Sequence, residues 1–310
     1  MPLMTSREAM EAALLDDPDD LVRHAAYADM LIEDGDPRGD FIRIQLQLEV
    51  EMLAAEVRKD LEAQSAAILK QHEREWLGPL YDSVYPEKVS PNTREFQIEW
   101  RCGWIDSVEL QVVDEIAISR LAQNPFAKLL QSISGTFWEK VGQKIGTTSW
   151  PNLRSFRLKM DRTASAVIAL IANRSLARLT QLTLDEYNPR RDIDPHDDEP
   201  VWLSNFCVSP ISLTLKDLAI VDLNFDDGSI DTLLSAGMIG RLKRLDLSRN
   251  IITDDTALAL AAHSDVAKLE HLSLDKNLLT AIGIEALAAV GHRISADQNF
   301  GGLHSFLGDL

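Results

Sequence analysis

Two stretches of this chain repeat one another. They are Leu242-Lys-Arg-Leu-Asp-Leu-Ser-Arg-Asn250 and, 27 residues later, Leu269-Glu-His-Leu-Ser-Leu-Asp-Lys-Asn277. Both follow the pattern L-x-x-L-x-L-x-x-N. In a short strand, residues two apart point to the same side, so Leu245 with Leu247 and Leu272 with Leu274 are expected to face a core. The closing Asn can turn its side-chain amide onto backbone groups that a bending chain leaves unpaired. One such unit cannot bury its own apolar face, so the pattern predicts stacked repeats.

This pattern resembles the strand-and-turn signature of leucine-rich repeats. Weaker copies are expected as strands at 105–110, 153–158, 179–184, 215–220 and 294–299, and a further copy at 126–129 has Gln131 at its third apolar position, which leaves its register open. Between the strands, residues 254–262 and 281–290 are rich in Ala and Leu and predict helices. A period of about 27 residues with a full helix is similar to the ribonuclease-inhibitor type of repeat. That resemblance implies a curved solenoid with parallel inner strands and outer helices, and it implies no ribonuclease inhibition.

The first 80 residues carry helical patterns instead. Thr5 and Glu8 have the spacing of a capping box, which begins a first helix. Asp17-Pro18 is expected to cap and start a second helix that runs to Ile32. After Asp36-Pro37, apolar residues continue at helical spacing to about residue 74, which is long for one helix, so a break near Asp60 is predicted.

The residues on both sides of Gly35, together with residues 73–80, resemble the bacterial repeat-companion domain. The resemblance is carried by Tyr27-Ala-Asp29-Met-Leu, by Gly35-Asp-Pro-Arg38-Gly-Asp-Phe41-Ile-Arg43-Ile-Gln45, and by Glu73-Arg-Glu-Trp76-Leu-Gly-Pro79-Leu80. Met30 departs from the usual tryptophan, and Gly39 replaces a residue that is often alanine. Such domains commonly precede repeat arrays, and the resemblance implies no known activity.

Three charged residues of this segment are candidates for a structural ionic tie. The Asp29 carboxylate, held by the guanidinium groups of Arg38 and Arg43, would join the second helix to the third across the turn at Gly35. The alternative is that these three residues form a recognition site. The structural interpretation suffices to explain the pattern.

The sequence therefore predicts an α/β chain in three parts. Residues 1–80 form a helical repeat-companion domain, residues 81–97 form a linker that contains Pro86 and Pro91, and residues 98–310 form the leucine-rich-repeat solenoid. A purely structural role is open for the helical domain, which could cap the apolar edge of the first repeat.

Charge and composition exclude several classes of function. The net charge is −18, and residues 1–90 alone carry 20 acidic against 9 basic side chains. Such a surface repels phosphate, so neither nucleic acid nor membrane is expected as a partner. Two cysteines, no signal peptide and no membrane-length apolar run indicate a cytoplasmic protein. The acidity itself suits solubility or, alternatively, a basic protein partner.

The repeat register predicts which side chains lie on the concave strand face and could bind a protein partner. The charged and polar candidates are Arg157, Lys159, Gln181, Asp185, Asp217, Arg244, Asp246, His271 and Asp275. Basic residues come early in this series and acidic residues late. Few aromatic side chains accompany them, although aromatic anchors are typical of binding surfaces.

A segment at 187–202 breaks the repeat period by about nine residues. Insertions in repeats often form binding loops, so Arg190, Arg191, His196 and Trp202 are further candidates for partner contacts. His196 and the three acidic residues after it could approach a divalent ion, but neighbours in one flexible loop rarely complete a coordination shell. No metal site is predicted.

No catalytic motif is present. The seven histidines are scattered, and neither Cys102 nor Cys207 is paired with one in sequence, although a spatial Cys–His pair stays open. We therefore expect a non-enzymatic protein–protein interaction module that needs no cofactor. The alternatives are a substrate-recruiting or regulatory subunit of an enzyme system, or a hydrolase whose site the sequence does not reveal.

Overall fold

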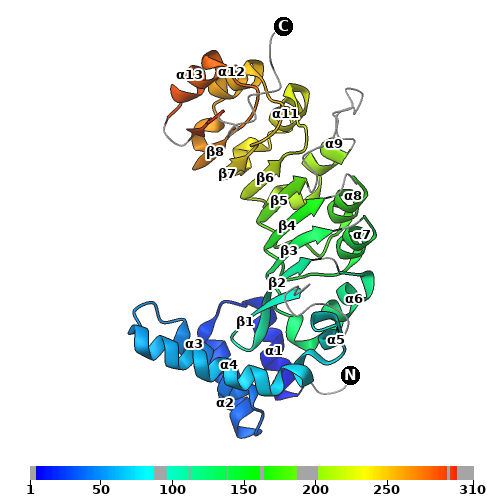
Figure 1. Cartoon of the computed structure of the whole chain (residues 1–310), viewed down its shortest axis with the longest axis vertical. Helices are drawn as coiled ribbons and strands as arrows, with labels where there is room; N and C mark the ends of the chain where they lie inside the picture. The colour runs from blue at the N-terminus through cyan, green and yellow to red at the C-terminus, as the bar shows by residue number, and fades with distance from the viewer. Residues whose placement is uncertain are drawn as a thin grey trace. The chain divides into compact units, whose positions relative to one another are not determined.

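The computed structural model of the chain describes residues 5–86, 96–111, 113–137, 139–160, 164–186, 202–291 and 294–298. The fold is a mixture of helices and strands, which confirms the predicted α/β class. In these described ranges nine strands form one sheet, ordered β1 to β9 as they occur along the chain. The chain divides into two compact units, Met1–Ile133 with Thr148–Leu153, and Ser134–Thr147 with Arg154–Leu310 (Figure 1).

The first unit combines helices with a two-stranded hairpin. Its elements are α1 (Ser6–Asp16), α2 (Leu21–Glu33), α3 (Arg38–Leu48), α4 (Ala55–Leu77), the 3-10 turn η1 (Gly78–Leu80), α5 (Tyr81–Val84), β1 (Phe96–Arg101), β2 (Trp104–Gln111), α6 (Glu115–Gln123) and the 3-10 turn η2 (Pro125–Ala127). Strands β1 and β2 pair antiparallel. Strand β1 differs from the sequence prediction, in which its first two residues belong to the linker at 81–97.

Local capping explains where the first helices begin. The capping box predicted for α1 is confirmed, since the Thr5 side chain accepts from the Glu8 amide while the Glu8 carboxylate accepts from the Thr5 amide. The predicted start of α2 at Asp17-Pro18 is wrong. Asp20 caps this helix by accepting from the amides of Val22 and Arg23, so the helix begins at residue 21.

The break in the long helical pattern comes earlier than predicted. Helix α3 ends at Leu48 and α4 begins at Ala55, so the chain turns at residues 49–54 and not near Asp60. The Arg58 guanidinium fixes this turn, because it donates to the carbonyl oxygens of Leu48 at 3.3 Å and Val50 at 3.2 Å. A side chain near the start of α4 thereby satisfies carbonyls that the end of α3 leaves unpaired.

The helices and the hairpin of the first unit share one apolar core. Its buried members are Leu14, Tyr27, Ala28, Leu31, Ile42, Cys102, Trp104 and Leu129. The compact unit consequently extends past the predicted boundary at residue 98 to residue 133. The predicted linker at 81–97 contains α5 and the start of β1, and its residues 87–95 lie outside the described part of the chain.

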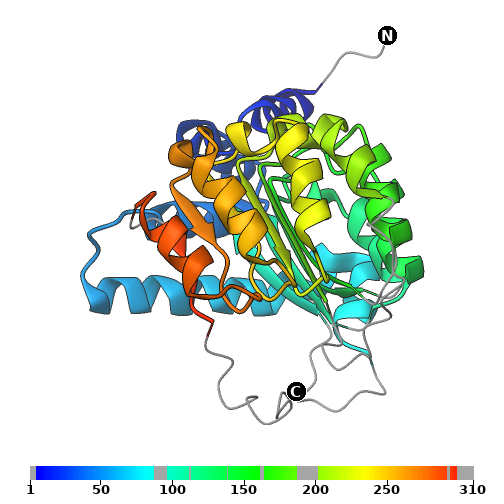
Figure 2. The same cartoon turned by 90° about the horizontal axis from the view of Figure 1, so that it is seen from above.

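The second unit alternates short parallel strands with helices. It contains most of β3 (Ser132–Phe137), then α7 (Glu139–Thr147), β4 (Ser155–Met160), α8 (Ala164–Ala172), β5 (Gln181–Glu186), α9 (Trp202–Cys207), α10 (Pro210–Thr214), β6 (Asp217–Val221), α11 (Asp227–Ser235), η3 (Ile239–Arg241), β7 (Arg244–Asp246), α12 (Asp254–Ala262), η4 (Val266–Lys268), β8 (His271–Ser273), α13 (Ala281–Ala288) and β9 (Ile294–Ser295). Strands β4 to β9 are all paired parallel. Figure 2 shows the helices of this unit on one side of its strands.

The inward direction predicted for the repeat leucines is confirmed. Leu245, Leu247 and Leu274 are fully buried, and Leu272 is 1% exposed. They point toward the helices because alternate residues of a strand face opposite sides. The other side of these strands is left to polar residues.

The strand proposed at 126–129 is wrong. Residues 125–127 form the turn η2, and the strand begins at Ser132, where Ile133 is buried. Asn124 supports the turn, since its side chain accepts from the Phe126 amide and donates to the carbonyls of Trp76 and Leu77. The tight turn uses the residues that the sequence pattern assigned to a strand.

A ladder of acceptors joins the helix starts of the last repeats. Asp227 accepts from the amide and hydroxyl of Thr253, and Asp254 does the same for Thr280, 27 residues further on. Thr253 and Thr280 are themselves the caps of α12 and α13. Each helix start is thereby tied to the preceding one by side-chain hydrogen bonds.

Candidate functional site

The solvent side of strands β4 to β8 is the surface on which the predicted binding residues lie. We call it the strand face and define it by the alternate residues of these strands that point away from the helices: Ser155, Arg157, Lys159, Gln181, Thr183, Asp185, Asp217, Ala219, Val221, Arg244, Asp246, His271, Ser273 and Asp275. The strand register arranges its side chains in rows across the strands. The first row is Ser155, Gln181, Asp217, Arg244 and His271, and the middle row is Arg157, Thr183, Ala219, Asp246 and Ser273. The sheet therefore brings together residues more than a hundred positions apart.

The strand face is hollowed at its centre. A depression of about 300 Å³ is lined by residues of β4 to β8, including Arg157, Thr183, Ala219, Asp246 and His271. The hollow forms because the middle row carries the small side chains of Thr183 and Ala219 between longer ones. Polar and charged groups surround this floor, so the hollow can hold polar side chains of a ligand.

Part of the first row neutralises itself. The Nε of Arg244 lies 3.0 Å from Asp217 Oδ1, and the Gln181 amide donates to Asp217 Oδ2 at 3.1 Å. Both oxygens of this carboxylate are therefore occupied. Because Asp217 and Arg244 are directly opposite in the register, their pairing follows from the repeat.

A second ion pair connects two repeats that are not neighbours. Arg249 Nη2 lies 3.3 Å from Asp185 Oδ1, although the two residues belong to repeats with another repeat between them. The repeat in between contributes Asp222, whose pKa is raised by burial, against the opposing effect of the Arg249 charge. Asp275 is also engaged, since its Oδ1 accepts from the Ser295 hydroxyl and the Asp297 amide.

Arg157 and Asp246 have no ion-pair partner among the residues that the structure describes. Arg157 is exposed, and Asp246 is half-buried with its Oδ1 accepting from the Ser248 amide. Lys159 is half-buried and His271 is exposed, and neither joins an ion pair in the described ranges. The middle row consequently contains a cation on β4 and a carboxylate on β7 that form no ion pair among the described residues.

Two buried asparagines fix the ends of the strands, as the repeat predicted. Asn250 accepts from the amides of Leu223 and Phe225, and donates to carbonyls that include those of Ile220 and Leu247. Asn277 bonds in the same way one repeat later. Asn299, predicted to end the last strand, lies outside the described residues.

The residue before each asparagine has a left-handed backbone. Arg249 has φ 59° and Lys276 has φ 57°, and Asp222, 27 residues before Arg249, has φ 60°. This turn lets the chain double back while the asparagine amide reaches the carbonyls behind it. It also projects Arg249 toward Asp185, a contact that the strand positions of the repeat alone do not predict. The position before Asn in the repeat is the signal that could have identified Arg249.

Residues 187–201 of the insertion lie outside the part of the chain that the structure describes. Arg190, Arg191 and His196 lie outside the described residues. Trp202 was predicted to contact a partner, and this prediction is wrong. Its side chain is 5% exposed and packs on Phe206 and Phe225, with ring centroids 6.0 Å and 5.9 Å away. Trp202 begins helix α9 and belongs to the core of the second unit.

The predicted ionic tie between α2 and α3 is also wrong. Asp29 is exposed, and Arg43 pairs with Asp40 on its own helix at 2.6 Å. Arg38 turns into the core instead, where its Nε donates to the carbonyl of Gly103 at 2.9 Å. Helix geometry explains why Arg43 pairs with Asp40 and not with Asp29. Asp40 lies about one turn away on the same helix, so the Arg43 side chain reaches it with less loss of conformational freedom.

Arg38 is a buried cation held by aromatic rings. Its guanidinium carbon lies 3.9 Å from the ring centroid of Trp104 and 4.4 Å from that of Phe126, and only 3% of the residue is exposed. Burial lowers the pKa of Arg38 to about 10. Its Nη1 donates to the Tyr27 hydroxyl, which donates to Glu11 at 2.8 Å. The charge is therefore balanced through a relay to a carboxylate near the surface.

Further polar contacts join α3 and its C-terminal cap Glu49 to the hairpin. The Gln45 side chain donates to the Trp100 carbonyl at 3.0 Å and accepts from the Gly103 amide at 2.7 Å. The Arg101 guanidinium donates two hydrogen bonds of 2.9 Å to the Glu49 carboxylate. These hydrogen bonds lower the pKa of Glu49. These contacts explain structurally why the hairpin belongs to the first unit.

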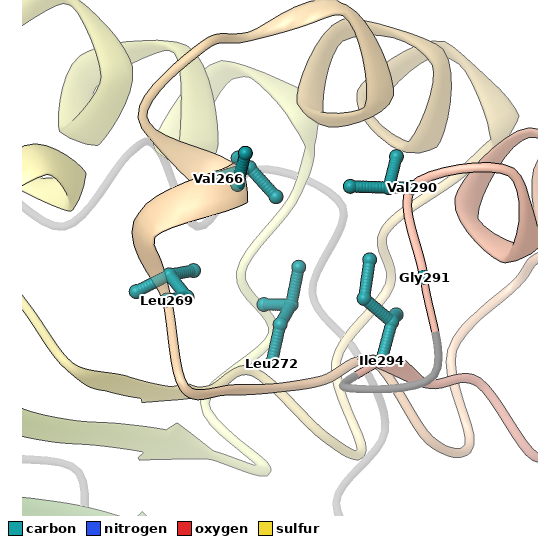
Figure 3. Close-up of a pocket in the computed structure, with 7 residues that line it drawn as sticks. Val266, Leu269, Leu272, Val290, Gly291 and Ile294 are labelled. Carbon is teal, nitrogen blue, oxygen red and sulfur yellow. The ribbon is translucent and has the colours of Figure 1, made fainter.

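A second hollow, at the last repeat, is apolar. It has a volume of about 250 Å³ and is lined by Val266, Leu269, Leu272, Val290 and Ile294, with Ala267 and Gly291 (Figure 3). The side chains that converge on it carry only carbon. This hollow offers no polar or titratable side chain that could bind a ligand specifically or carry out chemistry, so the strand face is the better candidate site.

The described residues include side chains of the kinds that bind metals or act as nucleophiles. They contain no cluster of three or more His, Cys, Asp or Glu side chains that could hold a metal. Both cysteines are buried, and burial raises the pKa of Cys102 to about 12, which keeps its thiol protonated. In the first row of the strand face, Ser155 and His271 are separated by four strand spacings, or about 19 Å, too far for a nucleophile and its base.

None of the helices in the described ranges is both long enough and apolar enough to cross a lipid bilayer.

Comparisons with known proteins identify no family. No protein-family model matches the chain, and no curated protein matches its sequence. Several solved structures are similar, among them the crystal structure of a protein from Bacteroides fragilis. That structure is 13% identical, covers 78% of this chain and 84% of its own, and superposes with a TM-score of 0.46. At this TM-score the likeness assigns neither a shared fold nor a function.

Proposed function

We propose that this chain is a leucine-rich-repeat protein that binds another protein on the strand face of its second unit. The observation that carries this proposal is the polar hollow of about 300 Å³, lined by side chains from five successive strands. Its floor is open to solvent, and its walls combine charged groups with hydrogen-bonding groups. Such a surface suits recognition of side chains from a partner.

The repeat assignment rests on three features of the second unit. The leucines of the pattern are buried, the asparagines bind the backbone of adjacent turns, and the strands from β4 onward are parallel with a helix between most of them. We extend the proposal to the N-terminal segment, which we assign to the repeat-companion domain on its sequence pattern. The contacts of Arg38 and Gln45 with the hairpin suit a domain that covers the beginning of a repeat array.

We propose a cytoplasmic, non-enzymatic role without a cofactor. The surplus of acidic side chains in residues 1–90 favours a basic surface on the partner outside the hollow. An adaptor role in an enzyme system would use the same binding surface. A hydrolase has less support, because the hollow contains no nucleophile beside a base among the described residues.

Filling the hollow tests this proposal. In Ala219→Trp, a large side chain would occupy the floor on the solvent side of β6, whereas Ala259→Trp adds the same bulk at an exposed position of α12. Both variants and the wild type are used as baits for affinity capture from the native lysate, followed by quantitative mass spectrometry. We expect one or a few proteins to be captured by wild type and by Ala259→Trp and lost with Ala219→Trp. Identical sets of captured proteins for all three baits would refute binding at the strand face.

A further inference from the structure

We infer that the hollow of the strand face recognises a protein segment with two opposite charges, an acidic side chain over Arg157 and a basic side chain over Asp246. This inference rests on the proposed function and specifies the chemistry of its partner. The partner segment would lie across the strands, along the middle row.

The shape of the middle row supports this orientation. Thr183 and Ala219 lie between Arg157 and Asp246, and Ser273 follows on β8. The small side chains of Thr183 and Ala219 lie at the floor of the hollow, and the longer side chains of Gln181, Asp217 and Arg244 in the first row line it on one side. An extended segment in this hollow would cross β4 to β7 in sequence.

The charged side chains without an ion-pair partner decide which end of the partner segment is acidic and which is basic. In the first row, Asp217 has both oxygens occupied by Gln181 and Arg244, so neither charge of that pair needs a partner. Asp185 is likewise neutralised by Arg249. Arg157 and Asp246 are the charges of the hollow that form no ion pair within the described residues. Electrostatic complementarity therefore requires a carboxylate near β4 and a cation near β7.

The register also gives the spacing. Arg157 and Asp246 are three strand spacings apart, which corresponds to about 14 Å. An extended chain advances about 3.4 Å per residue, so the two partner side chains should be roughly four residues apart. The strand face presents no aromatic anchor in β4 to β8, so charge rather than apolar burial would select the partner.

Defined peptides test this inference. Fluorescein-labelled peptides of otherwise Thr and Gly residues carry Glu and Lys four positions apart, Glu and Lys adjacent, two Glu or two Lys. Fluorescence anisotropy at low ionic strength gives their affinities for wild type. We expect the separated Glu/Lys peptide to bind most tightly and to weaken as salt is added. Equal affinities of the four peptides would overturn the inference.

Charge reversal separates recognition from misfolding. Arg157→Glu and Asp246→Lys should each weaken the separated Glu/Lys peptide by roughly two- to tenfold, because an attraction is lost and a repulsion is gained. The double reversal restores opposite charges at the same spacing, so it should regain binding relative to either single variant. Arg174→Glu and Asp231→Lys are the matched controls at exposed positions outside the hollow. A double variant that binds no better than the single variants would contradict the inference.

The two proposals can fail separately. If a protein captured from the lysate is lost with Ala219→Trp but is insensitive to both charge reversals, the strand face binds a partner by other contacts, and only the charge inference is wrong. If Ala219→Trp loses nothing, the proposed function itself fails.

Discussion

Replacing Asn250 tests whether the buried asparagines hold the strand ends of the second unit in place. The side chain is 5% exposed and forms hydrogen bonds in both directions. Its Oδ1 accepts from the Leu223 amide at 3.1 Å and from the Phe225 amide at 3.0 Å. In Asn250→Ala both amides lose this acceptor, and no methyl group can replace it.

The expected cost follows from the two orphaned amides. A buried donor without a partner costs about 1–3 kcal/mol. Phe225 is fully buried, whereas Leu223 is half-buried and water can reach its amide in part. The two together should lower the free energy of unfolding by about 2–4 kcal/mol. Asn205→Ala, at an exposed position of α9, is the control and should change it by less than about 0.5 kcal/mol.

A double variant isolates the coupling between successive repeats. The Leu247 carbonyl accepts from Asn250 at 2.9 Å and from Asn277 at 3.0 Å. Each single Ala variant leaves this carbonyl one of its two donors, and only the double variant removes both. The double variant should therefore cost about 0.5–1.5 kcal/mol more than the sum of the single variants.

Urea unfolding followed by circular dichroism gives the stability differences. Stacked units do not always unfold together, so hydrogen exchange of the segment 223–225 provides the local measurement. We expect this segment to lose protection in Asn250→Ala and to keep it in Asn205→Ala. Equal stability of these two variants, or strict additivity of the two repeat positions, would refute the role given to the asparagines.

Three further predictions concern other contacts. Arg38→Ala should lower the free energy of unfolding in urea by about 3–5 kcal/mol, because the substitution removes a buried cation that contacts aromatic rings. Arg38→Lys should recover little of this stability, since an ammonium group cannot stack on the rings as a flat guanidinium does. Gly39→Ala should cost about 1–3 kcal/mol in the same measurement, because the added methyl group would lie 2.7 Å from the carbonyl oxygen of Ala28 on the neighbouring helix; an unchanged midpoint would show that the helices can separate. Hydrogen bonds from Thr280 lower the pKa of Asp254, so its stabilising contribution is present above the unfolded pKa of about 3.9 and is lost as pH falls through the folded value; Asp254→Asn should flatten the decline of the melting temperature between about pH 6 and about pH 3, and an unchanged slope would contradict this assignment.

The repeats of the second unit could be predicted because their determinants are local and periodic. Leucine positions two apart and a closing asparagine recur every 27 residues at 242 and 269, and the structure buries each of them. The strand predicted at 126–129 was wrong because the prediction used the spacing of apolar residues alone. It ignored Asn124, whose side chain closes a turn. Gly39 shows a related limit, since its need for a hydrogen in place of a side chain arises from the approach of another helix.

Contacts between distant positions were not predictable in the same way. Arg38 had an acidic residue near it in sequence, which favoured an ion pair. In the structure the guanidinium lies between Trp104 and Phe126, and the energy of that arrangement depends on desolvated aromatic faces that no local pattern reveals. Trp202 was assigned to a loop because it follows a polar insertion, but its ring is large enough to form part of the core.

The strand face shows which features of a candidate binding site can be predicted from the sequence. The sequence predicted the membership of the face, because the repeat register alone selects those positions. It did not predict which charges are available. Asp217 with Arg244 can be inferred from the 27-residue period, whereas Asp185 with Arg249 spans 64 positions and depends on a left-handed turn before Asn250. Once both pairs are set aside, Arg157 and Asp246 are the charged side chains lining the hollow that form no ion pair among the described residues, and a partner must match them.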